Sequence, residues 1–483
     1  MDKFLLWLEN AVNTANTYLA DYILVILLIG VGLFFTIRTR FAQVRYFGQG
    51  LKNVFGGIKF NGGKQKSGMS SFQAFATAVA AQVGTGNIVG ACGAILAGGP
   101  GAIFWMWVIA FLGMATIYAE AVLAQKTKKV NEDGSVSGGP VYYIRTAFKG
   151  KFGKFLAGFF AVAAIICLGF VGAMVQSNSI SSAVASAGGY DYTKWGWIVG
   201  VIIALLTAII IIGGVKRIAS VTEKIVPIMA IIYILGGLII LCVNITALPM
   251  AFWFIIKYAF TPQAIIGGGV GVALKKAISM GAKRGLFSNE AGMGSTPHAH
   301  AQANVKTPHE QGTVAIVSVF LDTFVVLTMT ALIVITSLYV KNPEMLKDAR
   351  SNTMVQVAIS TLFNNPSIGT IVGAVFVAVC LSFFAFSTIV SWNLFGRVNF
   401  EYLFGKKSSI IYSIIAVVFV LLGSLLSNDL VWAFNDFFNY LMVIPNVIAL
   451  IALSGMVVNE LKENGKKSIE KTPNQALYQE ENK

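Results

Sequence analysis

The stretch SSFQAFATAVAAQVGTGNIVGACGAIL, residues 71–97, is long enough to cross a bilayer and carries Gly84, Gly86 and Gly90 at its centre. Irregular backbone is tolerated inside a membrane only where it is buried in protein or lines a cavity. Because glycine costs roughly 1 kcal/mol relative to alanine inside a helix, this run predicts a broken helix. Such breaks hold substrates and ions in secondary transporters. A close helix crossing through Gly86 and Gly90 is the alternative.

The composition indicates a polytopic membrane protein. Of the 483 residues, 56% are hydrophobic and 12% are charged, and the mean hydropathy is +0.73. The four cysteines lie singly in separate apolar stretches, so neither a disulfide framework nor a metal site is expected. No phosphate-binding loop is recognisable, which argues against ATP-driven transport by this chain.

Hydropathy predicts an all-α fold with eleven transmembrane helices. They are expected at residues 22–37, 71–97, 101–125, 155–183, 196–214, 221–244, 250–282, 312–340, 367–396, 410–426 and 430–458.

The basic residues predict how these helices are oriented. Residues 38–70 carry seven Lys and Arg and no acid, and of the 36 basic residues only six fall on the opposite side: Lys3, Lys194, Lys257, Lys341, Lys347 and Arg350. The positive-inside rule then places the N-terminus outside and the C-terminus inside. The net charge of +15 is expected to meet anionic lipid headgroups, and no nucleic acid partner is expected.

The spans divide into an extra helix and two sets of five. Since five is odd, the second set must cross the membrane in the opposite sense, as in inverted-repeat transporters. The second set begins with another interrupted span, which contains Pro262 and the run 267–271, GGGVG. The expected segments are an extracellular interfacial helix (1–21), the extra helix with a basic cytoplasmic loop (22–70), the two repeats (71–244 and 250–458) and a cytoplasmic tail (459–483).

Several strings resemble the alanine/glycine:cation symporter family: VGTGNIVG (83–90), MVQSNSI (174–180), RGLFSNEAGMGS (284–295), LDTFVVLTMTAL (321–332) and NYLMVIPNVIAL (439–450). The similarity covers roughly residues 22 to 460, and RGLFSNEAG is its most specific string. The resemblance implies a leucine-transporter-type fold, sodium coupling, small neutral amino acids as substrates and a location in a prokaryotic cytoplasmic membrane. Alternating access is then the expected mechanism.

Substrate contacts are expected first at the helix break. Amides freed at Thr85 and Gly86 can hold a carboxylate, and Asn87 can contact the substrate or a cation. These side chains could instead satisfy the broken backbone locally.

The resemblance also implies a substrate contact at Gln176, for which a hydrogen bond between helices is the alternative. Trp392 is expected to form the inner wall of the pocket, unless it belongs to an interfacial aromatic belt near Arg397.

The expected sodium site combines the Ser387 and Thr388 hydroxyls with backbone carbonyls. By resemblance, those carbonyls belong to Ala80 and Val83. Hydroxyl and carbonyl oxygens suit a hard cation, although Ser and Thr hydroxyls can also bond back onto their own helix. Sodium is expected as a co-transported ion, and no cofactor is expected.

Other ionisable groups rank lower as ligands. Glu120, Asp322 and Asp436 lie within predicted spans, and Glu120 could simply pair with Lys126 and Lys128. Glu290 and the three histidines fall in residues 283–311, which are expected to form a cytoplasmic loop. A proton-coupled carrier, a channel and an intramembrane enzyme are the rival functions. Proton-coupled relatives tend to carry a lysine on the fifth core span, and residues 225–244 hold none.

Substrate size is expected to depend on Gly269. In the family this position of the second break is often aromatic, so a glycine here predicts a larger pocket. Glutamine is then expected to be accepted as well as, or better than, alanine and glycine, with Gln176 and Asn87 available to bond a longer polar side chain. The alternative is that Trp392 or a neighbour fills the space and the preference for small substrates persists.

Overall fold

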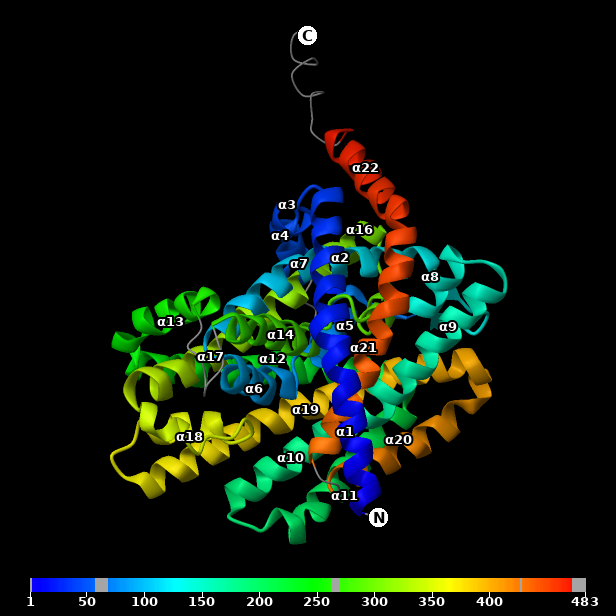
Figure 1. Cartoon of the computed structure of the whole chain (residues 1–483). Coiled ribbons are helices and arrows are strands. Elements are labelled where there is room, and N and C mark those ends of the chain that lie inside the picture. Colours follow the sequence, from blue (N-terminus) through cyan, green and yellow to red (C-terminus); the bar gives the residue numbers. More distant parts are fainter. Residues whose placement is uncertain (1, 57–67, 262–269, 426–427, 471–483) are drawn as a thin grey trace, which may run out of the picture.

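The computed structural model describes residues 2–56, 68–261, 270–425 and 428–470, and these are almost entirely helical (Figure 1). Two minimal sheets are present in this part of the chain. Strand β1 (Met69–Ser70) pairs in parallel with β4 (Ala303–Asn304), and β2 (Lys129–Val130) pairs antiparallel with β3 (Val136–Ser137). The all-helical class expected from hydropathy is therefore confirmed.

Within the described ranges, nine helices are long and apolar enough to cross a membrane, or ten when one bent pair counts as a single span. Several of them combine α-helix with short π-helical or 3-10 segments, both labelled η. The long runs are α1 (Asp2–Tyr18) with η1 (Leu19–Leu24) and α2 (Val25–Arg38); α7 (Gly101–Thr127); α9 (Gly150–Ala164) with η3 (Ile165–Val171) and α10 (Gly172–Gly188); α11 (Tyr192–Ile212); α12 (Gly214–Val243); α16 (Pro308–Val319) with η5 (Phe320–Leu327), α17 (Thr328–Val334) and η6 (Ile335–Lys341); α19 (Pro366–Phe404); η8 (Lys406–Ser408) with α20 (Ser409–Gly423); and α21 (Asn428–Ala452).

Shorter helices connect these runs or, in the case of the last one, follow them. They are α3 (Ala42–Arg45), α4 (Phe47–Phe55), α8 (Pro140–Ala147), η4 (Ile245–Ala247), α13 (Leu248–Phe260), η7 (Pro343–Leu346), α18 (Met354–Ser360) and α22 (Ser454–Glu470).

The bent pair is the glycine-rich segment. Helix α5 (Ser71–Gln82) begins with a capping box between Ser70 and Gln73 and ends at Gln82. The chain resumes as η2 (Gly86–Gly90) and α6 (Ala91–Gly98), bent by 46° from α5. The predicted break is therefore present, at the predicted glycines.

A second break lies where the sequence predicted a loop. Helix α14 (Val270–Asn289) is followed by residues with positive φ at Glu290, Gly292 and Gly294, and then by α15 (Pro297–Gln302). Residues 286–303 are all buried. The expectation of a cytoplasmic loop at 283–311 is therefore wrong. Hydropathy assigns polar side chains to loops, and it carries no information on hydrogen bonds to distant residues that allow such side chains to be buried.

The predicted span 250–282 has no single counterpart. The shorter apolar helix α13 ends at Phe260 and α14 begins at Val270, while the predicted break from Pro262 to Gly269 lies outside the described residues. At the N-terminus, residues 7–38 form one continuous helix, so the interfacial helix expected at 1–21 is not a separate element.

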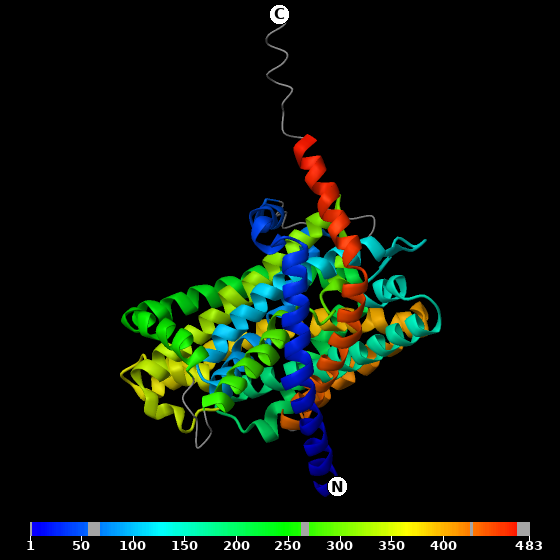
Figure 2. The same cartoon turned by 45° about the horizontal axis from the view of Figure 1, so that its top comes forward.

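The first break lies deep in the bundle. Helix α5 packs against α12, α16 and α19, while α7 packs along both α14 and α16. Helices α1 and α2 run beside α21 on one face, and α1 and α22 lie at opposite ends of the molecule (Figures 1 and 2).

Candidate functional site

The first break brings backbone amides next to polar side chains. The Gly84 amide donates to Asn87 Oδ1 over 2.9 Å, and the Thr85 amide donates to Gln176 Oε1 over 3.2 Å. The Thr85 hydroxyl is buried and has no hydrogen-bond partner among the described residues. The break thus presents a free hydroxyl and polarised amides, which suits a small polar ligand.

Gly84 is the point of closest approach in this break. A Cβ atom added there would lie 2.6 Å from Thr388 Oγ1 and 3.2 Å from Gln176 Oε1. Only glycine lets the backbone meet α10 and α19 at this distance. Of the residues expected to bind substrate, Thr85 and Gln176 are brought together here.

Five oxygens gather between α5 and α19. Thr388 Oγ1 lies 2.9 Å from the Ala80 carbonyl and 3.4 Å from the Val83 carbonyl, and Ser387 Oγ lies 3.4 Å from the Ala80 carbonyl. Both hydroxyls also lie within 3.0 Å of the Phe384 carbonyl. All four residues expected at the sodium site therefore lie together. Phe384 adds an oxygen that the sequence analysis missed, although back-bonding from Ser and Thr to residues three and four earlier pointed to it.

Asn87 points away from the five oxygens, toward a buried carboxylate. Its Nδ2 donates to Asp322 Oδ1 over 2.6 Å, and the hydroxyls of Ser288 and Thr323 each donate to the other oxygen, Oδ2, over 2.8 Å. Ser288 belongs to α14, and a Cβ at Gly86 would lie 3.1 Å from its Cα. Asp322 therefore links the first break to the end of α14.

The second break surrounds two buried glutamates. Trp392 Nε1 donates to Glu290 Oε1 over 2.5 Å, and the Ser295 hydroxyl bonds to the other oxygen. Trp392 is only 1% exposed, so it is an interior residue and not part of an aromatic belt. Its ring packs edge-on against Phe287 of α14, 6.1 Å between centroids.

Glu120 also holds the second break. Its carboxylate accepts from the Gly292 amide over 3.2 Å and from Asn446 Nδ2 over 2.6 Å. Lys126 pairs instead with Glu460 over 2.8 Å. The suggestion that Glu120 pairs with basic residues at the end of its helix is therefore wrong.

The three histidines are buried in separate hydrogen-bond networks. His298 contacts the Ser295 carbonyl, His300 contacts Gln311, and His309 contacts Tyr118. Among the residues that the structure describes, no three His, Cys, Asp or Glu side chains form a metal-binding group.

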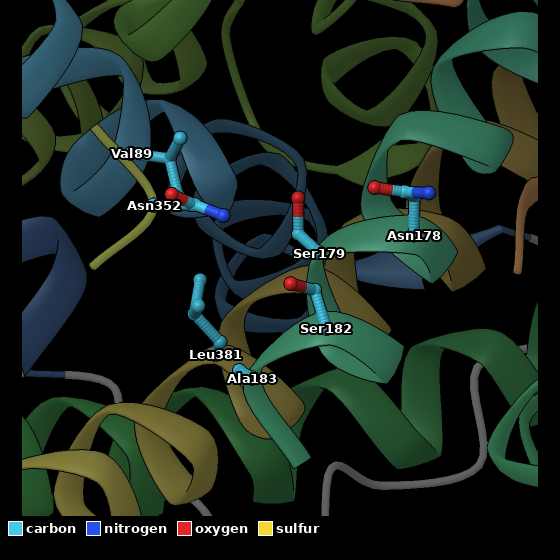
Figure 3. A pocket seen from close by; sticks show the side chains of 7 residues that line it. All are labelled: Val89, Asn178, Ser179, Ser182, Ala183, Asn352 and Leu381. Atoms are coloured by element: carbon cyan, nitrogen blue, oxygen red, sulfur yellow. The ribbon is translucent and has the colours of Figure 1, made fainter. Parts of the chain in front are cut away.

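Two openings meet at Val89 of η2, on the α6 side of the first break. One is a small polar pocket of about 20 Å³, where Ser179 and Ser182 of α10 lie across from Val89 and Asn352 (Figure 3). It has room for a single water molecule.

The other opening is a cleft of about 400 Å³, lined by Arg284, Trp432 and Asp436. Arg284 pairs with Asp436, with an Nη2–Oδ2 distance of 3.3 Å, and lies over the Trp432 ring. Gly269, expected beside the substrate, lies outside the described residues.

Comparisons with known proteins agree on one family. A profile of the sodium:alanine symporter family matches residues 5–477. The chain is 42% identical to the sodium/alanine symporter AgcS of Methanococcus maripaludis, over 93% of this chain and 96% of that protein. It is 37% identical to the probable sodium/glutamine symporter GlnT of Bacillus subtilis, over 94% and 90% of the two chains.

A solved structure supports the fold. The crystal structure of MhsT in complex with L-phenylalanine superposes with a TM-score of 0.56 at 16% identity, covering 82% of this chain and all of that one. At this identity the likeness concerns the fold alone.

Proposed function

Because this chain belongs to the sodium:alanine symporter family, we propose that it is a secondary active symporter that takes up small neutral amino acids together with sodium by alternating access. The observation that carries the proposal is the group of five oxygens between α5 and α19, directly beside the amides of the first break. Uptake of labelled alanine with and without sodium tests it.

Sodium fits these five oxygens by its chemistry. In the described geometry the Ser387 and Thr388 hydroxyls donate their protons to carbonyls. A sodium ion placed among the five oxygens would be coordinated by their lone pairs, and the two hydroxyl groups would rotate so that their protons point away from the ion. The carbonyls of Ala80 and Val83 then become ligands at the very end of α5.

The substrate site adjoins the ion site through Gly84. We place the amino acid's carboxylate at the amides of Thr85 and Gly86, where it would displace Gln176 Oε1 from the Thr85 amide, with the unpartnered Thr85 hydroxyl as a further donor. Gln176 and Trp392 then bound the pocket on the α10 and α19 sides. Because Val83 and Thr85 belong to one short turn, sodium binding would fix the amide geometry that the carboxylate requires, and each ligand would raise the affinity of the other.

Proton coupling is the rival mechanism. It would need an ionisable side chain at the five-oxygen site, one that binds and releases a proton in the role that sodium has here. Helix α12 instead presents the Met229 sulfur, 3.5 Å from Ser387 Oγ. A thioether binds no proton near neutral pH, so this contact favours sodium.

The second break completes the proposed architecture. Counting α14 and α15 as one broken span gives eleven spans, in an extra helix followed by two sets of five. The broken spans, α5–α6 and α14–α15, then head the two repeats and would move against a scaffold that contains α10 and α19. The repeats correspond to the predicted segments 71–244 and 250–458, with the second break moved to residues 290–296.

The proposed orientation puts α1 outside and α22 in the cytoplasm, in agreement with their positions at opposite ends of the molecule. In a Cys242→Ala background, which removes the one cysteine exposed in the described chain, an impermeant maleimide should label Glu344→Cys in intact cells. It should label Lys52→Cys only after lysis. The reverse pattern would invert the topology.

Glutamine is the proposed additional substrate. The proposal requires that Gly269, where the family often has an aromatic residue, borders the pocket; the missing phenyl ring would then leave room for a longer side chain. Excess glutamine should compete with labelled alanine, and Gly269→Phe should remove that competition while sparing alanine uptake. If glutamine does not compete in the native protein, Gly269 does not enlarge the pocket.

A further inference from the structure

A buried acid on α12 lies outside the site described above. Glu223 is only 5% exposed, and its Oε2 atom has no hydrogen-bond partner among the described residues. An ionisable group held in this way within a membrane protein is costly and calls for a ligand or a function.

The backbone adds a second free oxygen at the same residue. Pro227 lies inside α12 and has no N–H group. The carbonyl of Glu223, four residues earlier, therefore lacks its ordinary helical donor. One residue thus offers a carboxylate oxygen and a backbone oxygen without their usual partners, which is the ligand chemistry that hard cations prefer.

Hydroxyl groups link Thr222, the residue before Glu223, to the proposed sodium site. Thr222 Oγ1, on the neighbouring residue, lies 3.0 Å from Thr77 Oγ1 of α5, and both residues are fully buried. Thr77 lies one helical turn before Ala80, whose carbonyl contacts Thr388. On α12, Met229 contacts Ser387. Thr222 lies seven residues earlier on the same helix, about 10 Å away along its axis. Both connections therefore lead from the five oxygens to Thr222, the residue that precedes Glu223 on α12.

We propose that Glu223, with its own carbonyl and the Thr77 and Thr222 hydroxyls, forms a transient sodium site on the route by which the ion leaves toward the cytoplasm. The inference rests on the proposed function and orientation, in which the start of α5 faces inward. The carboxylate of Glu223 would attract the sodium ion out of the five-oxygen site once α5 moves. A single carboxylate would bind the ion too weakly to retain it.

Transport measured in right-side-out vesicles that carry the full chain distinguishes sodium release on the inside from sodium binding on the outside. Net alanine uptake driven by a sodium gradient requires sodium to leave on the inside, whereas alanine exchange with equal sodium on both sides does not. Glu223→Gln should lower net uptake by about tenfold, equivalent to about 1.4 kcal/mol, and should leave exchange and the external sodium dependence unchanged. Glu223→Asp should restore most of the net uptake, and Thr222→Val should give a smaller loss in the same direction.

Glu132→Gln is the matched control, because it makes the same charge change at an exposed acid. Equal losses of net uptake and exchange in Glu223→Gln would show a structural role and overturn the proposal, as would unchanged net uptake. Absence of sodium-dependent uptake in the native protein would instead refute the proposed function itself.

Discussion

Thr388→Ala should raise the sodium concentration needed for half-maximal alanine uptake by about tenfold or more. The substitution removes the hydroxyl that lies 2.9 Å from the Ala80 carbonyl and 3.4 Å from the Val83 carbonyl. Losing one oxygen that contacts a charged group costs on the order of 1–3 kcal/mol. The half-maximal sodium concentration is obtained from alanine uptake measured over a range of sodium concentrations and normalised to the amount of protein in the membrane.

Two variants on the same helix serve as controls. Thr388→Ser keeps the oxygen and should stay near native sodium dependence. Thr370→Ala removes an exposed hydroxyl that bonds only to its own helix and should have no effect. If Thr388→Ala keeps native sodium dependence, Thr388 is not a sodium ligand.

Gly84→Ala should abolish most uptake, with a loss of about tenfold or more. The added methyl group would lie 2.6 Å from Thr388 Oγ1, closer than packed atoms allow. Relieving the clash must move α5 or turn the Thr388 side chain, and such overpacking typically costs about 1–3 kcal/mol. Sodium and substrate binding should weaken together, because the same turn serves both.

Gly93→Ala tests whether the loss is specific to the break. Gly93 lies in α6 of the same broken span, and its added Cβ would meet only Ser351 at an ordinary 3.8 Å. This variant should transport nearly as well as the native protein. Native sodium affinity in Gly84→Ala, or equal losses in the two variants, would contradict the proposed packing of the first break.

The first break and the five-oxygen group were largely predictable from the sequence. Gly84 and Gly86 lie in a segment otherwise long and apolar enough to span a membrane, and this favoured a break over the alternative of a close helix crossing. The hydroxyls of Ser387 and Thr388 could be placed beside α5 only through the family resemblance, because hydropathy carries no information on which helices touch. The Phe384 backbone oxygen was not part of the predicted site, although Ser and Thr hydroxyls commonly bond to carbonyls three and four residues earlier.

The second break escaped prediction for a physical reason. Its residues 288–296 are mostly polar or glycine, and such a stretch next to an apolar helix is typical of a loop. Here Glu290 is bonded by Trp392, and the Gly292 amide by Glu120, from helices distant in the sequence. Such long-range partners allow polar backbone to be buried, but they are invisible until the helices are assembled. The break predicted at Pro262 and the run GGGVG (267–271) lies almost entirely outside the described residues and stays a prediction.

Sodium-driven uptake by the purified protein tests the central claim most directly. The full chain is reconstituted in proteoliposomes, and uptake of labelled alanine is followed at fixed pH with sodium outside or with choline in its place. Alanine should accumulate only with sodium and should leave when the sodium gradient is collapsed. Accumulation in choline medium that follows an imposed proton gradient to the same extent would contradict sodium coupling at the five-oxygen group.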